Sequence, residues 1–274
     1  MSLKPPIKWA GGKTQLLDSL LTKIPSQFTG RYFEPFIGGG ALWLNLQPQN
    51  WVINDINNKL TRLWMEIRDN SDDLTIKISN LQELYLLSGD KKTFYYDIRK
   101  QFNQDLNIPV NFLFLNKYCF NGLYRENKKG EFNVPWNQKT DKAHWGDLED
   151  IANYMNRTTV EVRNLHWKDA ISDASEGDFI YFDPPYAKEK ATSFVSYTNN
   201  QFEMDDQKEL ALEFKKCAER GVYCMLSNSN TAEVHKLYEE FNITEVNATR
   251  AISRNKTGRK SSKCEVIITS FEIL

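Results

Sequence analysis

The order of the predicted elements constrains the fold of this chain more than any other feature of its sequence. Short apolar runs that predict strands, each followed by a helical pattern, occupy residues 31–69 and return after Thr159. Between these blocks, residues 74–154 have mainly helical periodicity. The predicted helices of this stretch lie at 74–87, 92–102 and 110–118. The order predicts one doubly wound α/β domain that is interrupted by a mainly helical insert.

The strand candidates of both blocks are short and end in turn or acidic residues. They lie at 31–36, 51–56, 160–165, 178–183 and 222–229. Residues 243–250 and 264–273 predict a terminal antiparallel hairpin. We expect a mostly parallel sheet with helices on both faces, formed by residues 1–70 and 157–274, and an inserted helical domain at 71–156. In such folds, ligands bind at the carboxyl ends of the strands.

One stretch of the insert departs from helical periodicity. Residues 127–130, Asn-Lys-Lys-Gly, supply turn chemistry between two extended runs and predict a β-hairpin at about 118–136. From Lys117 to Lys142, basic side chains alternate with aromatic ones, a mixture typical of surfaces that grip a nucleic-acid backbone and stack on bases. A second basic segment, 250–263, has six Lys and Arg and no acid, and is either a solvated loop or a further contact surface.

Composition excludes several other classes of protein. The formal net charge of −1 does not argue against a nucleic-acid partner, because phosphate contacts need only a local basic surface. Four cysteines without paired spacing and only three histidines predict neither a disulfide framework nor a metal site. They are Cys119, Cys217, Cys224 and Cys264, and we expect them to be reduced and structural. With no run of secretory or membrane-spanning length, we expect a cytoplasmic protein without a membrane partner.

A glycine-rich turn follows the first predicted strand, in the sequence Glu-Pro-Phe-Ile-Gly-Gly-Gly at 34–40. Gly38 and Gly40 allow the backbone to approach a ligand that a Cβ atom would exclude. Asp55, at the end of the next strand, is placed to accept hydrogen bonds from ribose hydroxyls. Together they predict an adenosine-containing cofactor, although Trp43 holds the position of the last glycine in the dinucleotide fingerprint. Such turns and acids also occur in α/β proteins without this ligand.

The segment from Lys8 to Thr14 ends in Gly-Lys-Thr, as phosphate-binding P-loops do. Its spacing excludes a P-loop, because Ile7 stands where the first glycine is required. Lys13 is instead expected to meet a carboxylate such as that of a methionine moiety, with Trp9 covering an apolar wall. The alternative is a helix start with ordinary capping residues.

The strongest signal is the tetrapeptide Asp183-Pro184-Pro185-Tyr186, directly after a predicted strand. Two prolines end the strand, remove two N–H donors and leave carbonyl oxygens pointing outward as acceptors beside the carboxylate. Such acceptors suit the amino group of adenine, because they favour a tetrahedral nitrogen whose lone pair can attack an electrophile. A base inside a duplex does not reach this site, so we expect it to be flipped out and stacked on Tyr186 and Phe182. The alternative is a plain turn.

Five motifs in one order resemble the bacterial and phage DNA adenine methyltransferase (Dam) family over nearly the whole chain. They are KWAGGK, FEPFIGGG, the acid of NDI, FNGLYR with GEFNVPW, and YFDPPY. The resemblance implies a class I, Rossmann-like methyltransferase fold with an inserted target-recognition domain. It also implies S-adenosylmethionine as cofactor, double-stranded DNA as substrate and N6 of adenine as the methylated atom.

Residue roles follow from the same resemblance. Catalysis is expected at Asp183, Pro184, Pro185 and Tyr186. Cofactor contacts are expected from Trp9, Lys13, Phe36, Gly38, Gly40, Asp55, Trp167 and Asp183. The family inserts into and reads DNA at the positions of Phe120, Asn121, Leu123, Arg125 and Pro135, and Lys8 is a further candidate for a guanine contact. The resemblance implies no metal.

GATC is the expected recognition site. Relatives that methylate GATC often continue the hairpin with Val-Pro-aromatic-Gly-Arg-Tyr-Lys, whereas residues 134–140 of this chain are Val-Pro-Trp-Asn-Gln-Lys-Thr. The Arg-Tyr pair is missing, which leaves the outer bases of the site open.

The expected mechanism is direct in-line transfer to N6 of a flipped adenine, held by Asp183 and the Pro184 carbonyl, without a covalent enzyme intermediate. A cytosine-N4 methyltransferase is one alternative, although those enzymes more often resemble Ser-Pro-Pro-Tyr. A catalytically silent DNA-binding module is another, and the intact Lys13, Asp55 and Asp183 argue against it. A cognate restriction endonuclease that acts separately is compatible with this function, and a monomer or weak dimer is expected.

Overall fold

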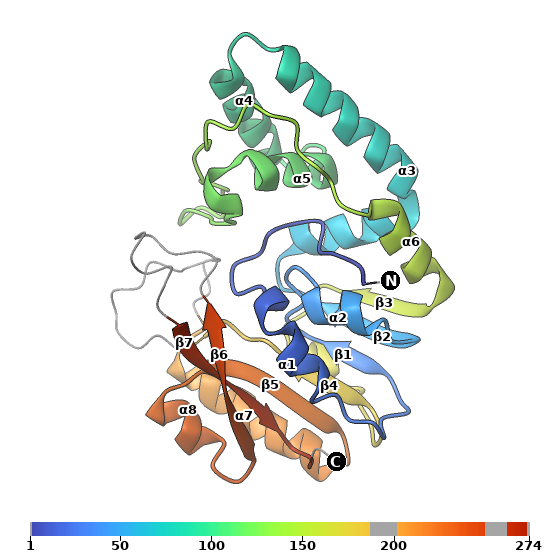
Figure 1. Ribbon diagram of the computed structural model, residues 1–274, viewed down its shortest axis with the longest axis vertical. Coiled ribbons are helices and arrows are strands. Elements are labelled where there is room, and N and C mark those ends of the chain that lie inside the picture. Colours follow the sequence, from blue (N-terminus) through green and yellow to red (C-terminus); the bar gives the residue numbers. More distant parts are fainter. Residues whose placement is uncertain (1, 187–201, 250–261, 273–274) are drawn as a thin grey trace.

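A seven-stranded sheet is the centre of the computed structural model, which describes residues 2–186, 202–249 and 262–272. The strands are β1 (Tyr32–Glu34), β2 (Asn50–Asn54), β3 (Thr159–Arg163), β4 (Phe179–Phe182), β5 (Tyr223–Ser229), β6 (Asn242–Thr249) and β7 (Ser262–Thr269). Their order is β3-β2-β1-β4-β5-β7-β6 (Figure 1). The pairs from β3 to β5 are parallel, and β7 is antiparallel to both β5 and β6. The predicted mostly parallel sheet with a terminal antiparallel hairpin is confirmed.

Alternation along the strands divides the core into two layers. In β4, Phe179 and Tyr181 belong to a hydrophobic cluster that also includes side chains of the helices α1 (Leu17–Leu21) and α2 (Ala41–Leu46). Ile180 and Phe182 pack in the cluster of α7 (Met204–Glu219) and α8 (Ala232–Leu237). Because successive strand side chains point to opposite faces, the continuous apolar run of β4 requires helices on both faces, as predicted.

A helical lobe interrupts the sheet domain between β2 and β3 (Figure 1). It contains α3 (Asn58–Leu87), α4 (Lys91–Asn103) and α5 (Ile108–Tyr118), and α6 (Leu148–Arg157) returns the chain to β3. The helical pattern that ends the first block at residue 69 and the helix predicted at 74–87 are joined into α3 by a kink at Asn70, where φ is −142° and ψ is 40°. Asparagine weakens a helix at such a point because its side chain competes for backbone hydrogen bonds. Short 3₁₀ helices are η1 (Lys13–Gln15), η2 (Phe120–Gly122) and η3 (Asp169–Ile171).

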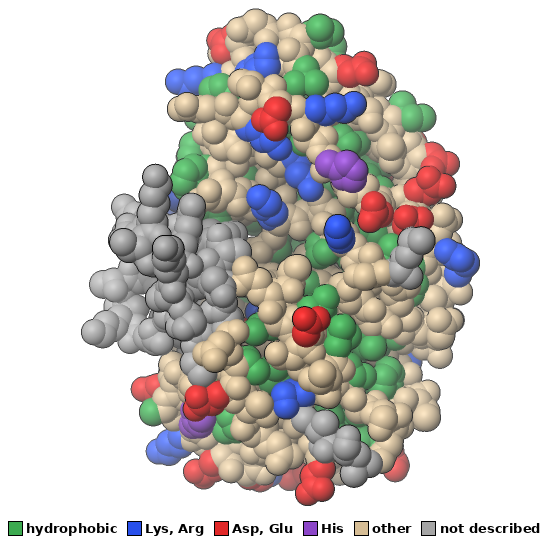
Figure 2. All heavy atoms as spheres, in the orientation of Figure 1, with side chains coloured by type: hydrophobic (Ala, Val, Ile, Leu, Met, Phe, Trp, Pro, Cys, Tyr) green, Lys and Arg blue, Asp and Glu red, His purple; other side chains and the backbone are tan. Residues whose placement is uncertain are grey.

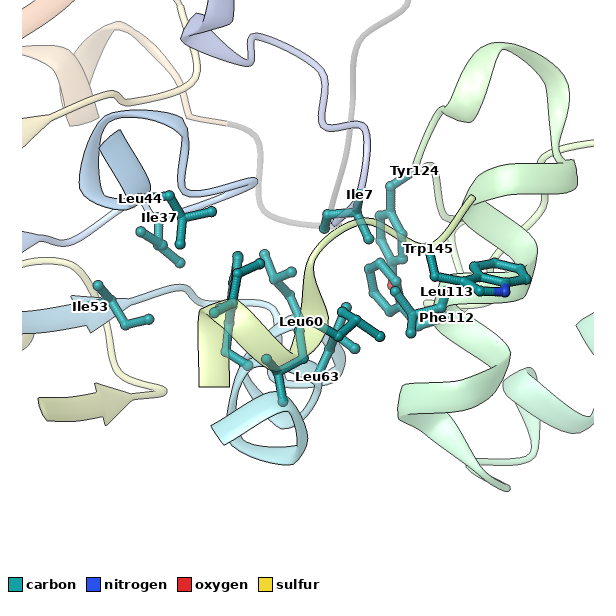
Figure 3. Close-up of a cluster of buried hydrophobic side chains, with 14 of the residues drawn as sticks. Ile7, Ile37, Leu44, Ile53, Leu60, Leu63, Phe112, Leu113, Tyr124 and Trp145 are labelled. Atoms are coloured by element: carbon teal, nitrogen blue, oxygen red, sulfur yellow. The ribbon is translucent and has the colours of Figure 1, made fainter. Parts of the chain in front are cut away.

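The lobe and the sheet share one hydrophobic core (Figure 3). Ile37, Leu44 and Ile53 of the sheet domain belong to the same buried cluster as Leu60 at the start of α3 and Phe112 of α5. Fully burying an aliphatic or aromatic side chain of this size stabilises a fold by about 1.5–3 kcal/mol. Packing therefore fixes the lobe against the sheet.

Residues 119–136, here termed the hairpin segment, fold back on themselves between α5 and α6. Cys119 bridges to Trp136 and Glu126 to Phe132, both in antiparallel sense. Asn103 of α4 accepts from the Phe132 N–H at 2.8 Å and donates to the Phe132 carbonyl at 3.0 Å. The last residue of α4 thus holds the hairpin segment through its side-chain amide.

Candidate active site

Three chain segments meet at the carboxyl edge of the sheet. The glycine turn at 37–40 follows β1, Asp55 follows β2, and Asp183 follows β4. Since β1 lies between β2 and β4, three neighbouring strands deliver these residues to one place. This edge is where open α/β sheets bind ligands.

Asp55 connects the glycine turn to the start of α3. Its Oδ2 accepts a hydrogen bond from the Gly38 N–H at 3.1 Å, and its Oδ1 accepts one from the Asn57 N–H at 3.0 Å. Burial raises the pKa of Asp55 to about 6, and the two backbone N–H groups oppose part of this rise. Because a carboxylate accepts about four hydrogen bonds, Asp55 retains capacity for ligand hydroxyls.

The glycines of the turn have backbone conformations and neighbours that other residues would disturb. Gly38 has φ +48° and Gly40 has φ +70°. A Cβ atom on Gly38 would lie 2.6 Å from Cδ1 of Trp9. The indole of Trp9 also stacks on Tyr124 and Phe112, with ring centroids 5.3 and 6.2 Å away. Trp9 therefore fills the space between the glycine turn and the helical lobe.

Lys13 and Asp183 form a largely buried ion pair. Nζ of Lys13 lies 2.7 Å from Oδ1 of Asp183 and donates to the Gly11 carbonyl at 2.6 Å. Only 5% of the Lys13 side chain and 17% of the Asp183 side chain are exposed. Burial raises the pKa of Asp183 to about 6, while Lys13 lowers it and Glu265 raises it further. The site thus contains a shielded cation and an anion of increased proton affinity.

The tetrapeptide is held by side chains of α7 and β7. Gln207 donates to the Pro185 carbonyl at 3.0 Å, and the Tyr186 hydroxyl donates to Glu265 at 2.5 Å. The Tyr186 ring lies 4.7 Å from Nζ of Lys13. Pro184 is buried and Pro185 is exposed. The prediction that both prolyl carbonyls point outward as acceptors is therefore wrong for Pro185, whose carbonyl is already bound by Gln207.

Glu34 is a further acid of this site that sequence reasoning missed. It is 3% exposed, and its Oε2 accepts from the Tyr32 hydroxyl at 2.6 Å. Burial raises the pKa of Glu34 to about 8; the Tyr32 hydrogen bond opposes this rise and nearby Asp183 adds to it. An acid in an otherwise aromatic strand was the available signal.

Phe36 and Trp167 form an aromatic pair on the opposite face of the sheet from Trp9. Their ring centroids are 6.1 Å apart with 30° between the ring planes, and Phe202 meets Phe36 edge-on at 5.8 Å. Both belong to the core layer of α7. The structure brings Phe36 and Trp167 together and places Trp9 elsewhere.

A hollow of about 500 Å³ lies where the N-terminal segment meets the hairpin segment. Three lysines enter its lining, and we call it the basic hollow. Its lining residues are Lys8, Asn116, Lys117, Phe120, Asn121, Gly122, Asn137, Lys139 and His144. Burial together with Lys8 and Lys139 lowers the pKa of Lys117 to about 8. On the face shown in Figure 2, most visible Lys and Arg side chains lie over the lobe half of the molecule.

The residues expected to read DNA are distributed along the hairpin segment. Phe120 is 50% exposed, Asn121 has φ +59°, and both line the basic hollow. Arg125 and Pro135 are exposed and Leu123 is half-buried. Nε of Arg125 donates to Asn133 at 2.6 Å. Most of the second basic segment, 250–261, lies outside the described residues.

Other features of the described chain complete this picture. In the described ranges, no cluster of three or more His, Cys, Asp or Glu side chains is suited to a metal ion. Cys119, Cys217 and Cys224 are buried and free. No helix among the described residues has the length and apolar character needed to cross a membrane.

Comparison with known proteins places this geometry in a family context. The family model described as D12 class N6 adenine-specific DNA methyltransferase matches residues 9–252. The Type II methyltransferase M1.LlaDCHI of Lactococcus lactis subsp. cremoris is 36% identical, over 99% of this chain and 96% of its own length. The Type II methyltransferase M.MjaIII of Methanocaldococcus jannaschii is 37% identical, over 99% of this chain and 100% of its own. The DNA adenine methylase of Escherichia coli K12 is 31% identical, over 93% and 91%.

Proposed function

The chain belongs to the D12 class of N6 adenine-specific DNA methyltransferases, and on that premise we propose that it transfers the methyl group of S-adenosylmethionine to adenine N6 in double-stranded DNA. Membership defines the reaction as adenine-specific DNA methylation; the donor, the recognition site and the residue roles are the proposal. One observation carries it: the shielded Lys13–Asp183 pair, 2.7 Å apart, at the same sheet edge as the turn bound by Asp55.

The side chains at this edge fit S-adenosylmethionine group by group. Lys13 is a cation suited to the amino-acid carboxylate, and Asp183 is an anion suited to the ammonium group. Asp55 is an acceptor suited to ribose hydroxyls, and the Phe36–Trp167 pair offers apolar ring surface for adenine. When bound, the cofactor supplies an electrophilic methyl group on a sulfonium centre.

The tetrapeptide then acts on the target base. Asp183 and the Pro184 carbonyl accept hydrogen bonds from N6 of a flipped-out adenine and direct its lone pair outward. Since an aromatic amino group becomes acidic only after methylation, Asp183 polarises N6 and lies beside the proton that leaves afterwards. Tyr186 offers a ring face for stacking, and its hydrogen bond to Glu265 restrains that ring.

We propose residues 71–156 as the target-recognition domain and GATC as the first site to test. Phe120 and Pro135 are the candidates for insertion into the duplex, and Asn121, Arg125 and Lys8 are polar candidates for base contacts. Leu123 supplies an apolar contact on the same hairpin segment. Residues 137–140 lack the Arg-Tyr pair of many GATC enzymes, so the outer bases of the site are the positions that the mapping must decide.

Two relatives are named Type II methyltransferases. This supports a role in restriction and modification, for which we propose a separately acting endonuclease. We also propose that the protein itself is a monomer or weak dimer. Methylation of cytosine N4, the alternative chemistry, loses support because the matched class is adenine-specific.

The proposal is tested by incubating the protein with labelled S-adenosylmethionine and unmethylated plasmid DNA, then digesting to nucleosides and mapping the modified positions. Label in N6-methyladenine within GATC is the expected result. Label in N6-methyladenine at another sequence would overturn the GATC assignment alone. Label in N4-methylcytosine, or none, would overturn the proposed activity.

A further inference from the structure

Lys8 is fixed by a buried asparagine that sequence reasoning did not single out. The Asn116 Oδ1 accepts from the Lys8 N–H at 2.8 Å, and the Asn116 Nδ2 donates to the Lys8 carbonyl at 2.8 Å. The same Nδ2 donates to the Gly122 carbonyl at 3.3 Å. Asn116 is 3% exposed and lies on α5, whereas Lys8 is exposed.

This arrangement joins two chain segments that enter the basic hollow separately. Lys8 arrives on the N-terminal segment, and Gly122 lies between Asn121 and Leu123 of the hairpin segment. A side-chain amide that pairs with both the N–H and the carbonyl of one residue acts as a neighbouring strand does and restricts that residue's backbone. The Cα–Cβ direction of Lys8 is therefore set by Asn116.

Gly122 restricts the lysine from the other side. It has φ +66°, and a Cβ atom there would lie 2.7 Å from Cδ and 2.9 Å from Cβ of Lys8. The lysine stem thus passes directly over the Gly122 backbone. The lysine ammonium is a point charge at the end of a flexible side chain. It therefore distinguishes the edge of one nucleobase from another only if the Cα and Cβ atoms of the lysine are held in place.

We infer that Asn116 is a positioning residue for sequence recognition. It holds Lys8 at a fixed register against the hairpin segment, so that the Lys8 ammonium reaches one guanine-containing base pair. This inference rests on the proposed function, in which Lys8 contacts DNA. Asn116 itself touches protein backbone and acts through Lys8.

The test begins with the wild-type recognition sequence and a set of duplexes that each carry one changed base pair. Asn116→Asp keeps the size and the acceptor but removes two donated hydrogen bonds. We expect it to lower discrimination, as the ratio of kcat/KM for cognate and altered duplexes, by about tenfold at one base pair and little elsewhere. Lys8→Met should lose discrimination at the same pair, and adding Asn116→Asp to it should have no further effect.

Asn111→Asp is the matched control, because Asn111 is also buried on α5 and donates to the Leu106 carbonyl at 2.9 Å, away from Lys8. It should lower thermal stability without changing discrimination at any single pair. Equal losses over all duplexes in Asn116→Asp, or a loss that persists in the Lys8→Met background, would overturn the inference.

If Asn116→Asp does not fold, Gly122→Ala tests the inference instead, because the added methyl group displaces the Lys8 side chain from the side opposite Asn116. Reduced discrimination at the pair read by Lys8 supports the inference, and unchanged discrimination at that pair overturns it. A wild-type protein that methylates no adenine would instead refute the proposed function, before any variant is compared.

Discussion

Nζ of Lys13 lies 2.7 Å from Oδ1 of Asp183, which joins the N-terminal segment to the end of β4 inside a nearly closed site. The lysine also donates to the Gly11 carbonyl at 2.6 Å, so its charge is held by two acceptors. Removing one partner of a buried pair leaves the other charge uncompensated. Substitutions at the two positions should therefore have distinct and separable consequences.

Asp183→Asn should abolish most of the methyl transfer while DNA binding survives. The amide keeps the shape of the carboxylate but loses the charged acceptor for N6, and loss of one such group costs about 100- to 1,000-fold in kcat. Single-turnover methyl transfer and fluorescence anisotropy with a labelled duplex measure the two effects. Asp173→Asn is the control, since Asp173 is 45% exposed and pairs with Arg31 and Arg163 on the surface. Near-normal transfer by Asp183→Asn would remove Asp183 from the mechanism.

The pH dependence of kcat should report the protonation of Asp183 beside Lys13. Asp183 must be ionised to accept from N6, and its pKa is raised to about 6, so kcat should fall as the pH drops below that value. Lys13→Met removes the cation that lowers this pKa, and the acid limb should move to higher pH. The KM for S-adenosylmethionine should rise as well, because the variant lacks the partner for its carboxylate. An acid limb at the same pH in both proteins would contradict the coupling.

Glu34 should make the free energy of unfolding fall as the pH rises, which is the opposite of the dependence given by a carboxylate that a neighbouring cation stabilises. Its pKa in the fold is about 8 against an ordinary 4.5, so between these values the folded protein binds a proton that the unfolded chain releases. The free energy of unfolding should therefore fall as the pH rises through this window, by at most about 1.4 kcal/mol per pH unit. Glu34→Gln should remove this dependence. Urea unfolding at about pH 5 and about pH 8 compares the two slopes, and parallel slopes would show that Glu34 is not the group responsible.

Much of the site could be predicted because its residues lie at the ends of neighbouring parallel strands. The glycine turn, Asp55 and Asp183 each follow a recognisable strand, and the βαβ order requires those ends to meet. Lys13 was predicted to meet a cofactor carboxylate, but its ion pair with Asp183 was not predicted, because η1 carries no pattern that places it against β4.

The residues that support the tetrapeptide and Lys8 could not be predicted from the sequence, and the reason is physical. Gln207 and Glu265 come from α7 and β7, and only the folded chain brings them to the tetrapeptide. Asn116 has no periodic signal, since α5 is buried on almost every side.

Gly38→Ala should destabilise the fold through contact with Trp9. A matched glycine separates this effect from backbone strain: Gly130 has φ +77° with nothing within 4 Å of a Cβ, whereas Gly38 has φ +48° and Trp9 Cδ1 at 2.6 Å. Gly130→Ala should cost about 1–2 kcal/mol of unfolding free energy from strain alone. Gly38→Ala should cost about 1–3 kcal/mol more, from overpacking. Equal costs in urea unfolding would mean that the indole simply moves aside.

Gln207→Met should slow methyl transfer although Gln207 touches neither cofactor nor base. Gln207 is fully buried, donates to the Pro185 carbonyl at 3.0 Å, and accepts from Asn228 at 3.0 Å. Methionine keeps the length of the side chain and removes both hydrogen bonds. The freed tetrapeptide should then shift relative to the Lys13–Asp183 pair, and a displacement of about 1 Å lowers kcat by about 100-fold.

The control for this variant is Gln82→Met, because Gln82 is 1% exposed and donates to the Ala143 carbonyl at 3.0 Å inside the helical lobe. Both variants leave buried polar groups unpaired and should lose about 1–3 kcal/mol of unfolding free energy. Only Gln207→Met should lose kcat in steady-state methylation at a temperature where both remain folded, with the KM for S-adenosylmethionine little changed. If the two variants slow the reaction equally, the loss reflects general destabilisation and the Gln207 bond does not position the tetrapeptide.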